Sequence, residues 1–199
     1  MHFLTVEPGD PMRRVVEDLI RSIYRDAYGA ELAAFPRHLV ALADAQGRPL
    51  CAAGLRLGWQ ASFSACYLDE DIEELIRRRT GRSVAPDAIL EVTTLAGIGH
   101  GHAMLLIERV REIGRGLGMG CGVCTATAPL RRALRRAGYT VVELVPAMRE
   151  RVGDPAAWGS YYDADPAVCL LDDVPAGHRA GRLPVGPSLR TLLPGTIHA

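Results

Sequence analysis

Residues 89–139 hold most of the side chains that could do chemistry. A carboxylate, Glu91, stands inside the apolar run Ile89–Leu95, where an unpaired charge would be costly to bury. Burial raises the pKa of a carboxyl group toward the range of a useful general base, so Glu91 is a candidate base. The alternative is a structural carboxylate that holds a backbone or arginine partner.

A glycine-punctuated turn follows this run and opens a helical pattern. Gly97, Gly99 and Gly101 relieve backbone sterics there, and the turn points backbone N–H groups toward a possible anion. We therefore expect a phosphate-bearing cofactor. His100 and His102 could contact phosphate or substrate, or one could serve as a base; the alternative is a pair of exposed turn residues. No Cys or acid lies at a nearby spacing that suits zinc, so no metal is expected.

Cys121 and Cys124 form a CxxC pair in the apolar run 121–127. In a strand, residues i and i+3 point to opposite faces, so these thiols cannot form a disulfide or share a metal. We expect two small buried side chains, with Cys124 as an acyl-accepting nucleophile the alternative. The five cysteines of the chain are too few and too scattered for a disulfide framework, which favours a reducing cytoplasm.

Two further groups of side chains are candidates. Trp158, Tyr161 and Tyr162 form an aromatic segment with Asp163 that either packs over a substrate or caps the core. The short helix predicted over Pro129–Ala137 carries the arginines Arg131, Arg132, Arg135 and Arg136. These arginines are either a solvated helix face or a docking patch for an acidic acyl carrier protein or for coenzyme phosphates.

The composition excludes several classes of function. The chain has 23 basic and 23 acidic residues, so no global positive field indicates nucleic acid. All the basic residues are arginine, which excludes a lysine Schiff base. No apolar run reaches the roughly 18 residues that span a bilayer, and the N-terminus lacks a signal-peptide pattern. We expect a cytoplasmic protein without a membrane partner.

The elements that must position these residues alternate between strand and helix. Expected strands are His2–Val6, His38–Ala43, Leu50–Leu57, Ile89–Leu95, Cys121–Thr127, Tyr139–Val145 and Val168–Leu171; expected helices are Pro11–Tyr28, Leu68–Thr80, one from His102 to about Gly116, and Pro129–Ala137. This order predicts an α/β fold, with a mixed central sheet, helices on both faces and a central β-α-β unit. One domain over residues 1–174 and a Pro/Gly/Arg-rich tail over 175–199 are expected.

The order of elements resembles the GNAT (GCN5-related N-acetyltransferase) acyltransferase fold. More narrowly, the sequence resembles the thermostable hemolysin family. The stretches that carry the likeness are Tyr24–Leu32, Glu91–Ala96, Thr125–Thr127 with Leu130 and Arg131, and Trp158–Asp163. They extend over nearly the whole chain up to about Leu171, and the aromatic segment is the most distinctive of them.

The resemblance implies a GNAT-like cleft for the pantetheine arm of an acyl thioester. The arm would lie between the strand ending near Gly97 and the strand Cys121–Thr127, which we expect to part just beyond residue 97. The implied cofactor-binding residues are Leu95, Ala96, Gly97, Gly99, His100, Gly101, His102 and Thr127. The implied substrate-binding residues are Trp158, Cys124 and Thr125.

The resemblance also implies catalytic roles. Glu91 would be the base, and backbone N–H groups near Leu95–Ala96 would support the oxyanion. The chain departs from the family pattern at Leu134, where GNAT enzymes have the tyrosine that protonates the thiolate. Tyr161 or Tyr162 would take that role. In GNAT enzymes this turn usually begins with Gln or Arg and grips the coenzyme A pyrophosphate, whereas this chain has Ile98 there. A carrier protein presents only phosphopantetheine and would need less of that grip.

The expected function is acyl transfer from acyl-CoA or an acyl carrier protein to an amine or hydroxyl of a small molecule, as in natural-product biosynthesis. Three alternatives stay open. A membrane-active, hemolysin-like protein would make liposomes leak without any thioester. A non-catalytic module would bind the thioester without turnover. An autoinducer-type synthase would acylate an amino-acid-derived amine.

Overall fold

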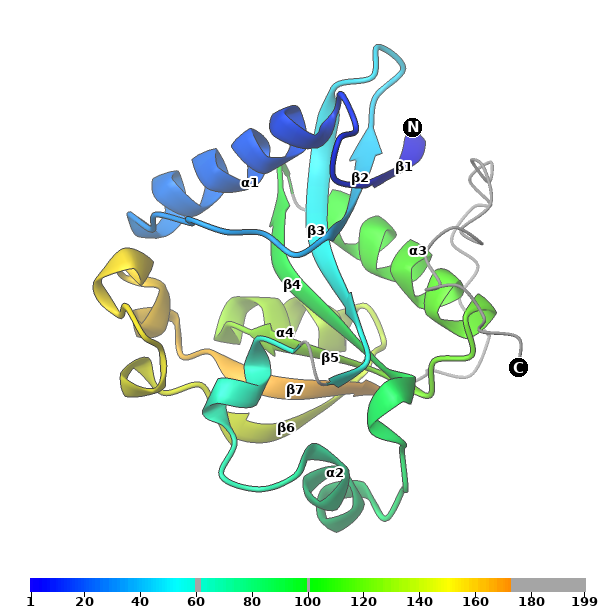
Figure 1. Cartoon of the computed structure of the whole chain (residues 1–199), viewed down its shortest axis with the longest axis vertical. Coiled ribbons are helices and arrows are strands. Elements are labelled where there is room, and N and C mark those ends of the chain that lie inside the picture. Colours follow the sequence, from blue (N-terminus) through cyan, green and yellow to red (C-terminus); the bar gives the residue numbers. More distant parts are fainter. Residues whose placement is uncertain (60–61, 100, 173–199) are drawn as a thin grey trace.

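The computed structural model describes residues 1–59, 62–99 and 101–172 of the chain. The strands are β1 (His2–Val6), β2 (His38–Ala43), β3 (Pro49–Leu57), β4 (Ile89–Gly97), β5 (Cys121–Ala126), β6 (Thr140–Pro146) and β7 (Ala167–Asp172). The α-helices are α1 (Arg13–Tyr28), α2 (Ile72–Thr80), α3 (His102–Gly116) and α4 (Ala128–Arg136). The strands form one sheet in the order β1-β2-β3-β4-β5-β7-β6 (Figure 1). This is the α/β architecture predicted from the sequence; His100 and the predicted tail 175–199 lie outside the described residues.

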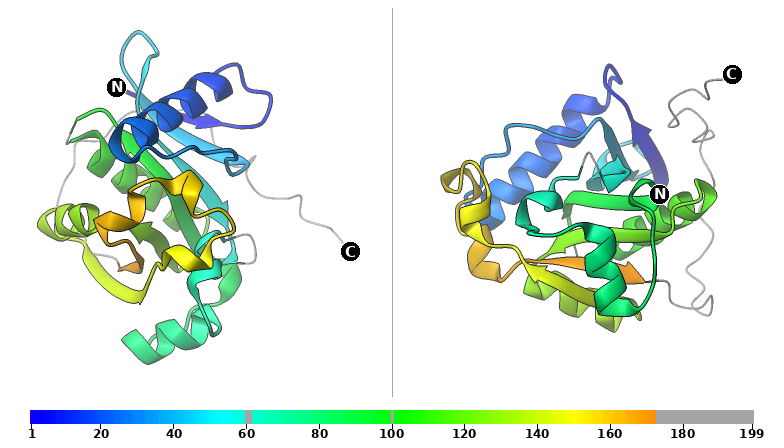
Figure 2. Two further views of the ribbon diagram at one scale, coloured as in Figure 1. Left: turned by 90° about the vertical axis from the view of Figure 1, so that its left-hand side faces the viewer. Right: turned by 60° about the horizontal axis from the view of Figure 1, so that its bottom comes forward.

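Helices cover both faces of the sheet. The α1 side chains Val16 and Ile20 pack with Ala96 of β4 on one face, and α2 packs on that same face farther along the sheet. On the other face, Leu106 of α3 packs against Leu90 of β4, and α4 packs over β5 and β7. The left view of Figure 2 shows α1 in front of the sheet and α3 behind it. Because both faces are covered, inner strands such as β2 are apolar along nearly their whole length.

The central β4–α3–β5 unit is parallel, as predicted, but its two strands part earlier than predicted. They pair from Ile89 with Cys121 to Val92 with Cys124, and no pair follows. The prediction that they part beyond residue 97 was therefore wrong. The cause lies in β4, where Thr94 has φ 47° and the register with β3 shifts, as in a β-bulge. The bulge bends β4 away from β5, and Figure 1 shows the two strands diverging.

Arg131 of α4 stabilises the end of β5 from inside the protein. It is 6% exposed, and its guanidinium donates to the carbonyl oxygens of Ala126 at 2.8 Å and Asp165 at 2.5 Å. It also pairs with the carboxylates of Asp165 at 2.6 Å and Glu143 at 3.2 Å. Both interpretations of Arg131 from the sequence, a solvated side chain or a docking residue, are therefore wrong. Arg132, Arg135 and Arg136 are exposed, and Arg135 pairs with Glu143 at 2.6 Å.

We predict that Arg131→Ala lowers the free energy of unfolding by about 2–4 kcal/mol, because it removes several charge-assisted hydrogen bonds, one to a buried carbonyl. Arg132→Ala, an exposed neighbour on the same helix, is the matched control and should change it by less than about 0.5 kcal/mol. Urea unfolding of both variants measures the difference. Equal stability of the two variants would contradict the buried role of Arg131.

Candidate active site between two separating strands

A cavity of about 780 Å³ opens where β4 and β5 separate. It is lined by the β4 residues beyond the last pair, by Cys124, Thr125 and Thr127 at the end of β5, and by side chains from helices on both faces of the sheet. Its volume lies within the range of small-molecule and cofactor sites. Because the strands diverge here, side chains from α1 on one face of the sheet and from α3 and α4 on the other line the same cavity. A continuous sheet would separate them.

The wall formed by α3 and α4 is apolar. Ala103 and Ile107 of α3 and Leu130 and Leu134 of α4 contribute to it. Leu134, where the GNAT pattern has tyrosine, thus lies at the cavity wall and offers no proton. Beyond Val92, the edge of β4 that faces away from β3 pairs with no strand of the described chain. Its backbone groups remain available to a ligand.

The opposite wall is aromatic. Tyr24 and Tyr28 of α1, Phe63, Trp158 and Tyr161 all line the cavity. The Tyr161 ring lies 5.2 Å from the rings of both Tyr28 and Trp158, measured between centroids. The Tyr28–Tyr161 pair is edge-to-face and the Trp158–Tyr161 pair is tilted, and both arrangements pack favourably at these separations. Trp158 and Tyr161 therefore lie at the cavity, as proposed from the sequence.

The aromatic segment is anchored to the end of α1 at a very close approach. The Ser160 N–H donates to the Tyr28 carbonyl at 2.8 Å, and the Glu31 N–H donates to the Ala157 carbonyl at 2.7 Å. Gly159 lies between these bonds with φ 51°, and a Cβ on it would be 2.1 Å from the Tyr28 oxygen. This position therefore requires glycine.

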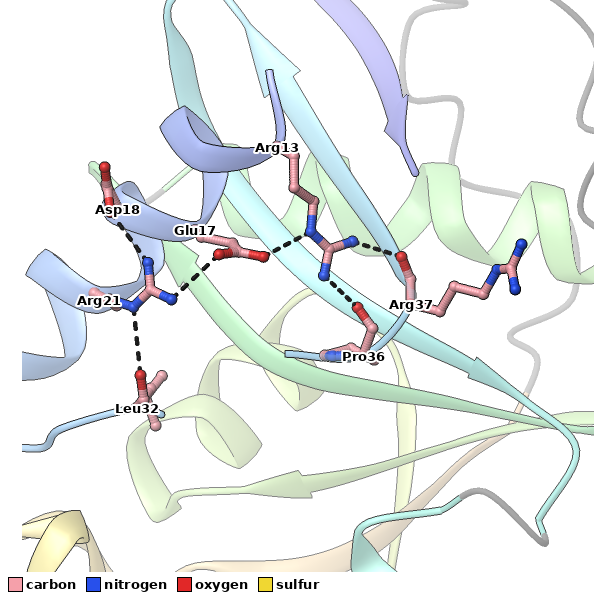
Figure 3. Close-up of polar contacts among 7 residues, drawn as sticks. All are labelled: Arg13, Glu17, Asp18, Arg21, Leu32, Pro36 and Arg37. Atoms are coloured by element: carbon pink, nitrogen blue, oxygen red, sulfur yellow. Dashed lines mark hydrogen bonds and ion pairs between the residues drawn. The ribbon is translucent and has the colours of Figure 1, made fainter. Parts of the chain in front are cut away.

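An arginine network fixes the segment 31–36, which lines the cavity beside α1 (Figure 3). Arg13 donates to the Pro36 carbonyl at 2.7 Å, and Arg21 donates to the Leu32 carbonyl at 3.4 Å. Glu17 lies between the two guanidinium groups, at 2.6 Å from Arg13 and 3.2 Å from Arg21. The α1 face beside its core side chains thus holds the cavity wall in place.

Glu91 is 1% exposed and lies behind the cavity lining rather than in it. Its two carboxylate oxygens accept the backbone N–H groups of Phe63 and Ser64, each at 2.8 Å. Arg56 Nε lies 3.7 Å from the same carboxylate. These contacts hold the 3₁₀ helix Ser64–Tyr67 against the sheet. Phe63 and Ser64 in turn line the cavity, so Glu91 positions part of its wall.

Two hydroxyl contacts meet at Thr125 of β5. Its Oγ1 lies 2.8 Å from the Ser64 hydroxyl, and its carbonyl accepts a hydrogen bond from the Tyr161 hydroxyl at 3.3 Å. Burial, followed by the neighbouring Tyr24, raises the pKa of Tyr161 well above its ordinary value. The phenol is therefore protonated throughout the neutral pH range.

Tyr162 faces away from the cavity lining. Its hydroxyl lies 2.8 Å from that of Tyr67, and burial raises its pKa. Of the two tyrosines proposed as proton donors, the structure thus brings Tyr161 to the cavity and places Tyr162 beside it, against Tyr67.

The residues proposed to bind the cofactor divide into two groups. Leu95, Ala96, Gly97 and Thr127 line the cavity. Gly99 and Gly101 precede α3, His102 is its first residue, and none of the three is part of the lining. The His102 ring is 2.6 Å from the Ile98 carbonyl through Nδ1, so one of its nitrogens holds the turn.

Cys121 and Cys124 lie on opposite faces of the sheet, as the strand geometry predicts, but only Cys124 is buried as expected; Cys121 is half-buried. Cys121 packs with the α2 side of the sheet and Cys124 with the α4 side, and all five cysteines are free. Burial raises the pKa of the Cys124 thiol, which disfavours the thiolate that a nucleophile needs. Within the described ranges, no group of three or more His, Cys, Asp or Glu side chains could hold a metal ion.

The cavity is also lined by residues that were not predicted as site residues from the sequence: Tyr24, Arg56, Ser64, Thr93 and Thr94. Ser64 and Arg56 are brought there by tertiary packing, for which the sequence offers no local signal. Thr93 and Thr94 did have a signal in the sequence, because they are polar residues of an apolar strand and lie shortly before the glycine turn.

The family described as thermostable hemolysin matches residues 6–176 of the chain. The comparison with curated protein sequences finds no match. In the described residues, no helix is both long enough and apolar enough to cross a membrane.

Solved structures align with most of the chain at low sequence identity. The acyl-homoserine lactone synthase LasI has a TM-score of 0.55 at 11% identity, covering 85% of this chain and 89% of LasI. FeeM, an N-acyl amino acid synthase from uncultured soil microbes, has a TM-score of 0.53 at 10% identity, covering 85% and 91%. BjaI, a CoA-dependent acyl-homoserine lactone synthase solved with SAM and isopentyl-CoA, has a TM-score of 0.51 at 14% identity, covering 84% and 81%. The TM-scores and the coverage establish a shared GNAT-like fold.

We predict that Gly159→Ala lowers the melting temperature by several degrees, since the added Cβ would overlap the Tyr28 carbonyl and separate the aromatic segment from α1. Gly153→Ala is the matched control, because a Cβ there meets no atom within 4 Å. Differential scanning calorimetry of both variants measures the effect. A melting temperature that is unchanged in Gly159→Ala would contradict the close approach.

Proposed function

The chain belongs to the thermostable hemolysin family and has a GNAT-like fold, and from this premise we propose that it is an acyltransferase. It moves an acyl group from a pantetheine thioester to an amine or hydroxyl of a small molecule. The observation that carries this proposal is the cavity at the separation of β4 and β5, which is lined from both faces of the sheet. A donor can enter from one face and an acceptor from the other, and the two meet between the strands.

The pantetheine arm would lie along the unpaired edge of β4. Leu95, Ala96 and Gly97 line the cavity there, and their backbone groups can pair with the amides of the arm as a neighbouring strand would. Gly99, Gly101 and the start of α3 follow this edge along the chain and would receive the phosphate. The apolar wall at Leu130 and Leu134 would exclude water from the thioester.

Both acyl-CoA and an acyl carrier protein suit this site. BjaI is described as CoA-dependent, which supports free acyl-CoA as one donor. Arg132 and Arg136 are exposed on α4, whose first residues follow the cavity residue Thr127. They can contact either coenzyme phosphates or the acidic surface of a carrier protein.

The acceptor would enter against the aromatic wall. The neighbours LasI and FeeM are described as synthases of acyl-homoserine lactones and N-acyl amino acids, respectively. An amino-acid-derived amine is therefore the first acceptor to test. Tyr24, Tyr28 and Trp158 would contact the apolar body of such a molecule.

In the proposed reaction, the acceptor nitrogen or oxygen bonds to the thioester carbon and loses a proton. Glu91 would accept this proton through water, because Phe63 and Ser64 stand between its carboxylate and the cavity. Collapse of the tetrahedral intermediate breaks the carbon–sulfur bond. The Tyr161 hydroxyl, protonated at neutral pH and directed to the Thr125 carbonyl, would return a proton to the sulfur.

A second candidate function is thioester binding without turnover. Leu134 favours it, because this cavity residue stands where GNAT enzymes carry the tyrosine that protonates the thiolate. The fold and the cleft would then be retained for binding alone.

We predict that the wild-type protein forms an acylated product with at least one pair from a panel of acyl-CoA and acyl-carrier-protein donors and amino-acid-derived amines. Mass spectrometry after incubation detects the product and tells the two donors apart. Thioester binding in calorimetry without product would select the binding module instead. If the protein instead neither binds a thioester nor forms a product, and makes liposomes leak without any thioester, acyl transfer and thioester binding are both wrong and the function is membrane-active.

We predict that Glu91→Gln lowers kcat by about 10²–10⁴, the usual contribution of a general base, while KM and the melting temperature change little. Kinetics and differential scanning calorimetry of the same variant distinguish this role from a structural one. If Glu91 only holds the backbone of Phe63 and Ser64, the variant should melt at a lower temperature and keep most of its kcat. Acyl transfer at the wild-type rate would remove Glu91 as the base.

A further inference from the structure

Two buried cysteines oppose each other in the sheet. In the antiparallel pair of β5 and β7, Cys124 stands directly opposite Cys169. Opposed residues of an antiparallel pair project from the same face of the sheet, and both side chains pack in one cluster with Ile107 of α3 and Leu134 of α4. In the strand registers of the described chain, no other two cysteines are opposed. Cys124 and Cys169 therefore form a thiol pair within the sheet.

The backbone places this pair within reach of a disulfide. Directly opposed residues of an antiparallel pair have Cα atoms about 4.5–5.5 Å apart, and disulfides span Cα separations of about 4.4–6.8 Å. The Cys169 Sγ donates to the Ala167 carbonyl at 3.4 Å, along its own strand. A rotation about the Cα–Cβ bond moves this sulfur off the carbonyl, so this hydrogen bond is the contact that closure gives up. The strand register itself permits a disulfide.

Cys124 is the member of the pair that a small molecule can reach. It is 7% exposed and lines the cavity, as do Ile107 and Leu134, which pack in the same cluster. Cys169 is 0% exposed and is not part of the lining. A small molecule in the cavity therefore meets Cys124 first, and Cys169 lies behind it. The apolar and aromatic walls of the cavity favour an uncharged molecule.

The surroundings of the two thiols determine how they react. Burial raises the pKa of both, that of Cys169 to about 12, and the neighbouring Cys169 raises the pKa of Cys124 further, as expected for two nearby sulfur atoms. The Arg131 guanidinium acts on the pKa of Cys169 in the opposite direction and favours its thiolate. Thiols with a raised pKa are poor leaving groups, so a disulfide between them is exchanged back slowly. The pair therefore reacts slowly but keeps a disulfide once it has formed.

We propose that Cys124 and Cys169 are a modification site for small uncharged aliphatic disulfides that enter the cavity, and that the pair then closes to a cross-strand disulfide. The Cys124 thiolate attacks one sulfur of the small disulfide, whose S–S bond breaks; one half leaves as a thiolate and takes up the proton that Cys124 lost. The Cys169 thiolate then attacks the Cys124 sulfur of this mixed disulfide, and the second half leaves as a thiol in the same way. The protein pair is oxidised by two electrons, and the small disulfide is reduced to two thiols.

The reaction changes the contents of the cavity in two steps. The mixed disulfide leaves an organic group beside Ile107 and Leu134 until Cys169 displaces it. Closure then releases this group and joins β5 covalently to β7. Acyl transfer is not required for this reaction, which uses only the register of two strands and the cavity beside them.

Pantethine, an uncharged aliphatic disulfide, is the probe. The experiment uses Cys121→Ser as the background, because trypsin, which cleaves after arginine here, leaves Cys121 and Cys124 on one peptide. The protein is incubated with pantethine, its remaining thiols are alkylated, and the digest is analysed by mass spectrometry. The peptides of Cys124 and Cys169 should be found joined by a disulfide, lighter by two hydrogens than the two peptides together.

Three variants in this background test the order of the steps. Cys169→Ala should stop the reaction at a stable mixed disulfide on Cys124, and Cys124→Ala should leave Cys169 as a free thiol. Cys51→Ala, a change at another buried cysteine of the sheet, is the matched control and should leave the yield of the cross-link unchanged.

The cross-link itself is measured with both cysteines of the pair in place, so the result stands even if a variant fails to fold. Recovery of Cys124 and Cys169 as alkylated thiols would overturn the proposed site. A mixed disulfide that persists on Cys124 while Cys169 stays free would overturn the closure.

Discussion

The structure depends on the early end of the pairing between β4 and β5. Parallel strands in the middle of a sheet normally stay hydrogen-bonded, because an unpaired backbone inside a protein is unfavourable. Here the last pair is Val92 with Cys124, although both strands continue beyond it. The bulge at Thr94 supplies the bend, and the apolar side chains of α3 and α4 shield the open edge on one face. The edge of β4 that this opens is where the amides of a thioester arm would pair.

The surrounding elements hold this opening in place from several sides. The Glu91 carboxylate holds the 3₁₀ helix Ser64–Tyr67 by accepting the Ser64 backbone N–H, and Arg131 ties the end of β5 to the loop at Asp165. Gly159 lets the aromatic segment approach the end of α1. Each contact comes from a part of the chain distant in sequence. The opening is therefore a property of the whole fold, and a local change at any of these contacts would alter its shape.

The sequence predicts the elements and their order well because apolar periodicity reports local structure directly. Glu91 stands out for a physical reason, since a carboxylate in an apolar strand must find partners. Those partners, backbone N–H groups of Phe63 and Ser64, have no sequence signal because any residue can supply them. Arg131 was misjudged for a similar reason: one of four arginines on a short helix is buried by the loop that reaches it. The bulge at Thr94 was missed because a threonine in a strand gives no sign of positive φ.

A co-crystal structure with a non-hydrolysable acyl-CoA thioether tests the central claim most directly. The account predicts that the pantetheine arm lies between β4 and β5, with its amides bonded to the backbone near Leu95–Gly97. An arm bound outside this opening, or β4 and β5 paired beyond Val92 with the ligand absent from the cavity, would contradict it.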